Sequence, residues 1–178
     1  EREHQCDQSF EKVNRLALKI KDKTGTPPAI ITSGSPSFPH HVKRSDVFLS
    51  PGTIPFWDAG YSKLWPTSPF QPAAILVTMI ISQSAKDLLC FDLGHKTVAA
   101  EMPFPRVVFP QLNEEATQVS QSEEHLVVRT QQAHLYEVGD IFYAIPIHIC
   151  PTVAKYAQAY TVENHLLSTP WPIDANIY

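Results

Sequence analysis

Apolar residues spaced three and four positions apart predict a single helix close to the start of the chain. Phe10, Val13, Ala17 and Ile20 fall on one face of a helix over residues 7–23. A glycine and two prolines follow within the next five residues, so the helix cannot continue far beyond this stretch. We therefore expect one amphipathic helix before the first strand.

Two short apolar runs come next, at residues 29–32 and 46–49. Each run ends in small polar residues, which is typical of a buried strand that leads into a loop. A connector over residues 36–44 separates the two runs. The order of helix, strand, connector and strand indicates a unit of an α/β architecture.

After about residue 61 the pattern changes to short apolar segments that follow one another closely. A proline-containing linker over residues 63–72 comes first, and turn residues such as Gly94 and Gly139 separate the later segments. The predicted strands cover residues 73–82, 88–92, 96–99, 106–109, 125–130, 134–137, 141–145 and 154–162. A spacing of about ten residues predicts a mainly antiparallel β-domain, either a sandwich or barrel-like.

The composition supports a packed core and argues against two classes of partner. Of the 178 residues, 43% are hydrophobic and 18% are charged, and the net charge is −4. No run of Lys or Arg is longer than two residues, so we expect no nucleic-acid partner. The longest apolar stretch, residues 72–81, is about half as long as a spanning helix, so we expect no membrane span.

Cysteine occurs three times, at Cys6, Cys90 and Cys150. An odd number at such wide spacing does not indicate a disulfide framework. Thiols that are free or bound to metal are typical of a reducing compartment, so we expect a cytoplasmic protein.

His148 and Cys150 form the first candidate site. If this piece is extended, side chains two residues apart point to the same side, and an imidazole and a thiolate together suit zinc. Two ligands are too few for a closed structural site, so we expect an open one that water, substrate or another segment completes. The alternative is an ordinary half-buried strand end.

Glu124 and His125 form a second candidate group. A carboxylate beside an imidazole suits acid–base catalysis or the orientation of a ligand. The alternative is a solvated turn that precedes a strand.

The loops after the first two predicted strands form a third candidate group. They contain Ser33, Gly34 and Ser35, and Gly52 and Thr53. Such loops expose backbone N–H groups and hydroxyls, which suit a phosphate. Because successive strand ends of a barrel face the same side, we expect the two loops to be neighbours.

The order of these motifs resembles the C-terminal half of the D-threonine aldolase and D-serine dehydratase family. The most specific match is Pro146-Ile147-His148-Ile149-Cys150, where the family reads P-x-H-x-C or P-x-H-x-D. The other matching stretches are residues 32–36, 49–53, 56–58, 92–96, 122–125 and 138–140.

The resemblance implies an α+β architecture and an activity. Residues 1–62 would be the incomplete C-terminal end of an alanine-racemase-like (β/α) barrel, and residues 63–178 a β-domain that carries the metal ligands. The family members are lyases that depend on pyridoxal phosphate and a divalent cation. They act on a β-hydroxy D-amino acid, by D-serine dehydration or D-threonine aldol cleavage, and are typically homodimers.

The resemblance also implies roles for single residues. His148 and Cys150 match ligands of Zn²⁺ or another divalent cation. The family's contacts to the cofactor phosphate match Ser33, Gly34, Ser35, Gly52 and Thr53. Motifs on the substrate side of the active site match Asp58, Glu124 and His125.

One departure from the family keeps other hypotheses open. The family's lysine, which forms an imine with the cofactor, lies near the start of the full-length enzymes, and no lysine of this chain matches it. A second hypothesis is therefore a catalytically inactive, truncated metal-binding or interaction β-domain. A third is an independent α+β protein whose motifs match by chance. The metal pair is compatible with dehydratase and aldolase chemistry alike.

Overall fold

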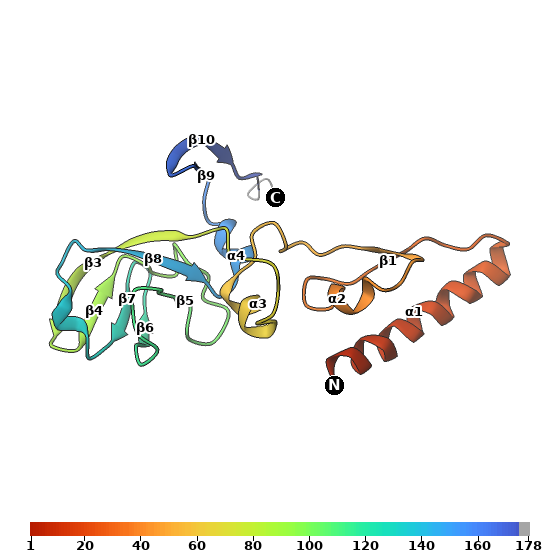
Figure 1. Cartoon of the computed structure of the whole chain (residues 1–178), viewed down its shortest axis with the longest axis horizontal. Helices are drawn as coiled ribbons and strands as arrows, with labels where there is room; N and C mark the ends of the chain where they lie inside the picture. The colour runs from red at the N-terminus through yellow and green to blue at the C-terminus, as the bar shows by residue number, and fades with distance from the viewer. Residues whose placement is uncertain (175–178) are drawn as a thin grey trace. The chain divides into compact units, whose positions relative to one another are not determined.

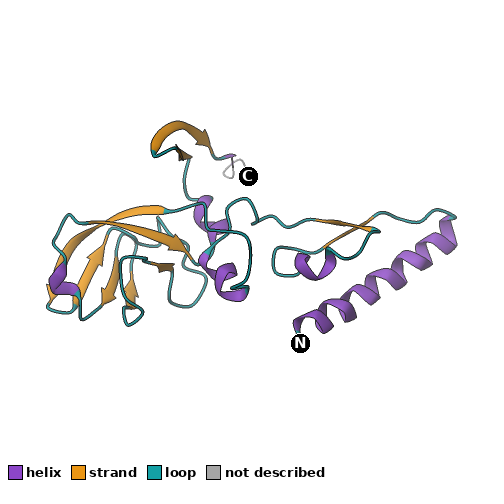
Figure 2. Cartoon of the chain, in the orientation of Figure 1, coloured by secondary structure: helices purple, strands orange, loops and turns teal. Residues whose placement is uncertain are grey.

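The structure is a computed structural model that describes residues 1–174. The chain divides into two compact units, Glu1–Pro55 and Phe56–Tyr178. Figure 2 shows that a long helix occupies the start of the first unit, whereas the regular secondary structure of the second unit is mostly strand. No helix among residues 1–174 is long and apolar enough to cross a membrane.

The first unit is built from a long helix and two short parallel strands (Figure 1). Its elements are α1 (Arg2–Thr24), β1 (Ile30–Thr32), α2 (Phe38–His41) and β2 (Val47–Leu49). α1 ends at Gly25, whose φ of 73° lies in the left-handed region that glycine adopts without a Cβ penalty. β1 pairs with β2 in parallel, with Thr32 opposite Leu49, so the loops that follow the two strands begin at the same edge.

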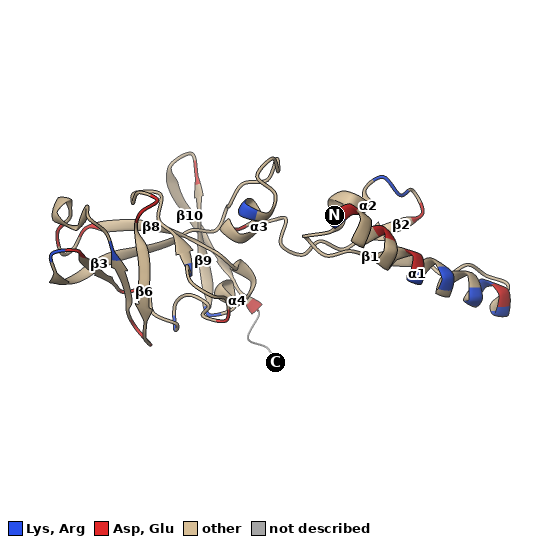
Figure 3. Cartoon of the chain, turned by 90° about the horizontal axis from the view of Figure 1, so that it is seen from below, with Lys and Arg blue, Asp and Glu red and all other residues tan. Residues whose placement is uncertain are grey.

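Phe10 is the buried residue of α1 and anchors the first half of that helix. Its ring lies 5.5 Å from the His41 ring between centroids, and the Arg44 guanidinium lies 4.1 Å above it. Arg44 also forms an ion pair with Asp7. Elsewhere α1 is mostly exposed and carries side chains of both charges (Figure 3).

The second unit contains a six-stranded antiparallel sheet in the order β5-β8-β3-β4-β7-β6. The strands are β3 (Leu76–Ala85), β4 (Leu88–Phe91), β5 (Val107–Val108), β6 (Thr117–Gln121), β7 (Leu126–Arg129) and β8 (Ile141–Pro146). A separate antiparallel hairpin consists of β9 (Gln158–Glu163) and β10 (Leu166–Pro172). The mainly antiparallel β-domain expected from the sequence is therefore confirmed.

Alternation along the strands places the core on one face of this sheet. Phe142 and Ala144 in β8 are buried, whereas Ile141 and Tyr143, which alternate with them, are exposed. The centre of the core is aromatic: the rings of Phe91 and Phe109 stack with centroids 4.7 Å apart, and Phe142 meets Phe91 edge-on at 5.1 Å.

Two predicted strands are wrong. Residues 96–99 form a turn, because the N–H groups of Thr97 and Val98 both donate to the carbonyl of Gly94 at 3.0 Å. Residues 134–137 overlap a short 3₁₀ helix, η1 (Ala133–Leu135). The strand predicted over residues 154–162 corresponds to β9, which starts only at Gln158. A helix, α4 (Ile149–Val153), comes before it, followed by a turn in which the N–H groups of Lys155 and Tyr156 donate to the carbonyls of Thr152 and Val153.

Candidate functional site

His148 lies at the junction of β8 and α4. Its backbone is extended, with φ −135° and ψ 105°, and it is the N-cap residue of α4. Residues 148–150 do not form the one extended piece that the sequence argument for convergence assumed, because Ile149 and Cys150 already belong to the first turn of the helix. Ile149 is buried, whereas Cys150 is exposed to solvent.

Asp58 fixes the start of α4 from a second helix, α3 (Ala59–Leu64). Its Oδ1 accepts a hydrogen bond from the N–H of Tyr61 at 2.8 Å, and its Oδ2 accepts one from the N–H of Ile149 at 3.1 Å. The residue is 1% exposed, and its bond from Ile149 is buried, whereas the bond from Tyr61 is partly buried. Asp58 therefore caps α3 and also holds the backbone next to His148.

Thr152, a residue of α4 itself, links this helix to the segment around Ala99. Its Oγ1 donates to the carbonyl of His148 at 2.8 Å and accepts a bond from the N–H of Ala99 at 3.2 Å. Four residues further on, the Tyr156 hydroxyl donates to the carbonyl of Thr97 at 2.9 Å. Burial raises the pKa of Tyr156, so the phenol keeps its proton at neutral pH and remains a donor.

Glu101 meets the candidate ligand His148, and sequence reasoning missed it. Its Oε1 lies 2.6 Å from Nδ1 of the imidazole. The two residues are 47 positions apart and Glu101 lies outside regular secondary structure, so no local pattern indicates the contact. Within residues 1–174, no three side chains of His, Cys, Asp or Glu converge as a ready metal site.

The predicted pair Glu124 and His125 lies in an exposed turn between β6 and β7. Lys96 Nζ contacts Glu124 at 2.7 Å and Glu123 at 3.0 Å. The Lys96 ammonium lowers the pKa of Glu124, and the pKa of Lys96 is raised in return. The Glu124 carboxylate thus already has a cationic partner, and a role on the substrate side stays a prediction.

The two loops of the first unit are neighbours, as expected from the strand order. The N–H of Thr53 donates to Ser35 Oγ at 3.0 Å, and both residues are buried. Ser50 Oγ donates to the carbonyl of Ser33 at 2.9 Å. Gly34 and Gly52 are exposed in these loops. The structure brings the candidate residues together, while their contact with a phosphate stays a prediction.

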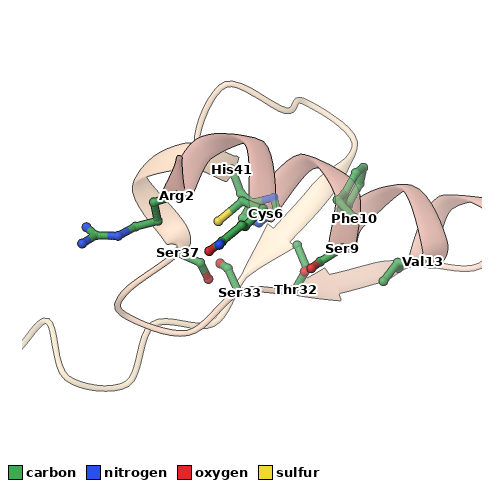
Figure 4. Close-up of a pocket in the computed structure, with 10 residues that line it drawn as sticks. Arg2, Cys6, Ser9, Phe10, Val13, Thr32, Ser33, Ser37 and His41 are labelled. Atoms are coloured by element: carbon green, nitrogen blue, oxygen red, sulfur yellow. The ribbon is translucent and has the colours of Figure 1, made fainter.

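A cavity of about 290 Å³ lies beside these loops, between α1, the end of β1 and α2 (Figure 4). Ser33 contributes to its wall and has a buried hydroxyl oxygen with no hydrogen-bond partner. His41 also lines it, and burial, with a smaller contribution from the Arg44 cation, lowers the pKa of this imidazole. The wall of the cavity therefore includes a residue whose hydroxyl oxygen has no hydrogen-bond partner.

Comparison with known proteins identifies a family and a fold. A family model described as "Putative serine dehydratase domain" matches residues 73–162, which is half of the chain. No curated protein sequence matches the chain. Among solved structures, a D-threonine aldolase from Filomicrobium marinum superposes with a TM-score of 0.85 at 18% identity. The superposition covers 97% of this chain and 47% of the aldolase.

Two other solved structures show the same fold. A D-threo-3-hydroxyaspartate dehydratase from Delftia sp. HT23 has a TM-score of 0.71 at 15% identity, over 87% of this chain and 47% of the enzyme. An alanine-racemase-like protein from Idiomarina loihiensis has a TM-score of 0.67 at 19% identity, over 82% of this chain and 44% of that protein. The chain thus spans about half the length of these proteins. It belongs to the D-serine dehydratase and D-threonine aldolase family.

Proposed function

We propose that this chain supplies the metal ligands and the cofactor-phosphate loops of a lyase that acts on a β-hydroxy D-amino acid. Such a lyase uses pyridoxal phosphate and Zn²⁺ or another divalent cation, and it catalyses D-serine dehydration or D-threonine aldol cleavage. The observation that carries the proposal is the arrangement at the start of α4. There His148 and Cys150 remain accessible while Asp58 and Thr152 fix the backbone around them.

The donor set at α4 fits a divalent cation. An imidazole nitrogen and a thiolate sulfur are both ligands that zinc accepts readily. The His148 side chain is 38% exposed and Cys150 is exposed, so a cation can reach both. Two protein ligands leave coordination positions for water or substrate, and an open position is what a catalytic cation needs.

Two structures of the hydroxyaspartate dehydratase support the same assignment. In one, a histidine is replaced by alanine. In the other, a cysteine two positions further on is replaced by alanine, and that protein is in the metal-free form. The spacing equals that of His148 and Cys150 in this chain.

The loops of the first unit fit a phosphate group. Ser33 has a buried oxygen without a partner, and the hydroxyl of Ser35 lies beside the backbone of Thr53. Hydroxyls and backbone N–H groups at successive loops are common phosphate ligands. We therefore assign Ser33, Gly34, Ser35, Gly52 and Thr53 to the cofactor phosphate and residues 1–62 to the end of a (β/α) barrel.

When bound, pyridoxal phosphate supplies the electron sink for the bond broken at the α-carbon, and a divalent cation supplies a Lewis acid beside the β-hydroxyl. The chain's own residues hold these groups. His148 and Cys150 bind the cation, and the loops of the first unit bind the phosphate. Asp58, Glu124 and His125 are assigned to the substrate side of the site.

A zinc titration tests the metal site. We expect about one zinc per chain, with the binding lost in His148→Ala and in Cys150→Ala. Cys6→Ala and His134→Ala are matched controls, because they remove a thiol and an exposed imidazole elsewhere, and both should bind zinc as the unaltered chain does. Unchanged binding in His148→Ala and Cys150→Ala would refute the metal site.

A product assay with pyridoxal phosphate and zinc separates the two reactions. From D-threonine, aldol cleavage gives glycine and acetaldehyde, whereas dehydration gives 2-oxobutanoate and ammonia. Turnover of D-serine to pyruvate and ammonia would indicate the dehydratase. Because no lysine of this chain matches the family's imine-forming lysine, the assay is made on the chain joined to the lysine-bearing half of a relative. Zinc binding there without turnover of either amino acid would favour the alternative of a catalytically inactive metal-binding β-domain.

We also infer that the chain forms a homodimer. The outer face of the sheet exposes apolar side chains in cross-strand pairs, Val77 with Tyr143 and Met79 with Ile141. Contiguous exposed apolar surface of this kind is typical of an interface. Light scattering after size-exclusion chromatography tests this: a dimer that dissociates in Val77→Lys supports the inference, and a monomer at all concentrations contradicts it.

A further inference from the structure

The His148 imidazole has two nitrogens, and a neighbouring carboxylate engages one of them. Glu101 Oε1 lies 2.6 Å from Nδ1, which is within hydrogen-bond distance. We propose that Glu101 is a positioning residue of the metal site: it accepts a hydrogen bond from Nδ1–H of His148 and leaves Nε2 as the nitrogen that binds the cation. This inference rests on the metal site proposed above.

The chemistry of the two groups fixes the direction of the bond. An ionised carboxylate can only accept, so the proton between the two groups belongs to Nδ1. A neutral imidazole carries one N–H, and Nε2 then keeps an unshared electron pair for a metal. Glu101 thereby selects the tautomer and restrains rotation of the ring.

Glu101 suits this role because its own segment is fastened to α4. The N–H of Ala99 donates to Thr152 Oγ1, and the same oxygen donates to the carbonyl of His148. Tyr156 binds the carbonyl of Thr97 in the same segment. Residues 97–101 are therefore held against residues 148–156, which include α4, by three contacts, and the Glu101–His148 bond is the one in which the side chain of a candidate ligand takes part.

A direct role of Glu101 as a third ligand is less consistent with the geometry. The carboxylate already engages Nδ1, and the described part of the chain contains no cluster of three ligating side chains. Glu101 therefore acts on the cation through His148.

Zinc affinity, measured in competition with a chromogenic chelator, tests the proposal. We expect Glu101→Ala to bind zinc about 10- to 100-fold more weakly than the unaltered chain, at the same stoichiometry. In Glu101→Gln the amide oxygen can still accept the bond from Nδ1–H. The zinc affinity of this variant should therefore lie between that of the unaltered chain and that of Glu101→Ala. Glu115→Ala is the matched control, because Glu115 is an exposed glutamate in another loop, and its affinity should be unchanged.

A second readout needs no metal. A proton–nitrogen correlation spectrum of the imidazole ring shows which nitrogen carries the proton in the zinc-free chain. We expect the Nδ1–H tautomer of His148 in the unaltered chain and a larger share of Nε2–H in Glu101→Ala. Unaltered zinc affinity in Glu101→Ala, or an Nε2–H tautomer in the unaltered chain, would overturn the inference.

These outcomes also separate the inference from the proposed metal site. If zinc binds and requires His148 but not Glu101, the metal site stands and the positioning role fails. If the unaltered chain binds no zinc, the proposed metal site fails. Glu101 then positions no metal ligand, so the inference fails with the site, whichever tautomer the spectrum shows. A thermal melt of each variant confirms that the chain is folded, and Glu101→Gln replaces Glu101→Ala if the alanine variant is not.

Discussion

The Asp58 carboxylate accepts hydrogen bonds from the backbone of two helices at once. One oxygen binds the N–H of Tyr61 in α3 and the other binds the N–H of Ile149 in α4. Sequence reasoning singled out Asp58 because it belongs to a motif. It did not predict the bond to Ile149, because that residue lies 91 positions away. The buried carboxylate therefore has a structural role in addition to the predicted role near the substrate.

Replacing Asp58 should destabilise the second unit. Asp58→Ala removes a helix cap and leaves buried N–H groups without partners, so we expect the free energy of unfolding to fall by roughly 2–4 kcal/mol. Urea denaturation measures the change. Asp140→Ala is the control, because Asp140 also accepts a backbone bond, from Glu137, but is exposed. An equal loss in both variants would contradict this account of Asp58.

His41 should make the stability of the folded chain depend on pH. Burial is the main cause of its lowered pKa, the Arg44 and His40 cations lower it further, and Asp7 opposes them. The folded state therefore favours the neutral imidazole, so the stabilisation is complete above the unfolded pKa of about 6.5 and is lost as pH falls through the folded pKa.

An NMR titration of the His41 ring checks that its pKa is lowered in the folded protein. Denaturation at several pH values checks the loss of stability at low pH. His41→Gln is the comparison, since that variant should lose the part of the pH dependence that His41 produces. A pKa at or above the ordinary histidine value would contradict it.

At the scale of elements, close backbone approach joins α3 to Ile147, the residue that follows β8. The N–H of Gly60 donates to the carbonyl of Ile147 at 3.1 Å, and a Cβ at Gly60 would lie 2.4 Å from that oxygen. Gly60→Ala should therefore push apart α3 and the residue that precedes His148. We expect the free energy of unfolding to fall by about 1–3 kcal/mol and zinc to bind more weakly.

The control for this variant is Gly52→Ala, because a Cβ there meets no atom within 4 Å. Thermal melting should show a lower midpoint for Gly60→Ala and little change for Gly52→Ala. Equal midpoints for the two variants and the unaltered chain would contradict the close approach.

The elements that the sequence predicted correctly are those with a strong apolar pattern. α1 and the strands around Phe91 and Phe142 were found because alternation or helical spacing is clear there. β6 was missed because Thr117–Gln121 is mostly polar, and β10 because it contains two prolines. α4 was missed because five residues are too few to show a helical period, and Ile149, Thr152 and Val153 favour a strand.

At the scale of the whole molecule, the contacts that hold the candidate metal ligands lie entirely within one unit. The partners of the residues around His148 are Asp58, Thr97, Ala99 and Glu101, and all of them belong to Phe56–Tyr178. The same unit contains the aromatic core. Sequence reasoning singled out the two candidate ligands by their spacing and by the family resemblance, but not these supporting contacts, because contacts between distant segments leave no local signal.

The second unit alone should therefore bind zinc with the affinity of the whole chain. We expect a protein of residues 56–178 to be folded, as its own core indicates, and to give the same zinc titration. A much weaker titration, by contrast, would mean that the first unit contributes to the metal site.

The contacts around α4 also link ligand binding to unfolding. Residues 58, 97–101 and 148–156 come together only in the folded domain, so a cation that needs their arrangement binds the native state in preference to the unfolded chain. Mass action then adds about 2.7 kcal/mol of stability when the free cation is at one hundred times its dissociation constant. Removing the cation with a chelator should lower the melting temperature of a domain whose covalent structure is unchanged.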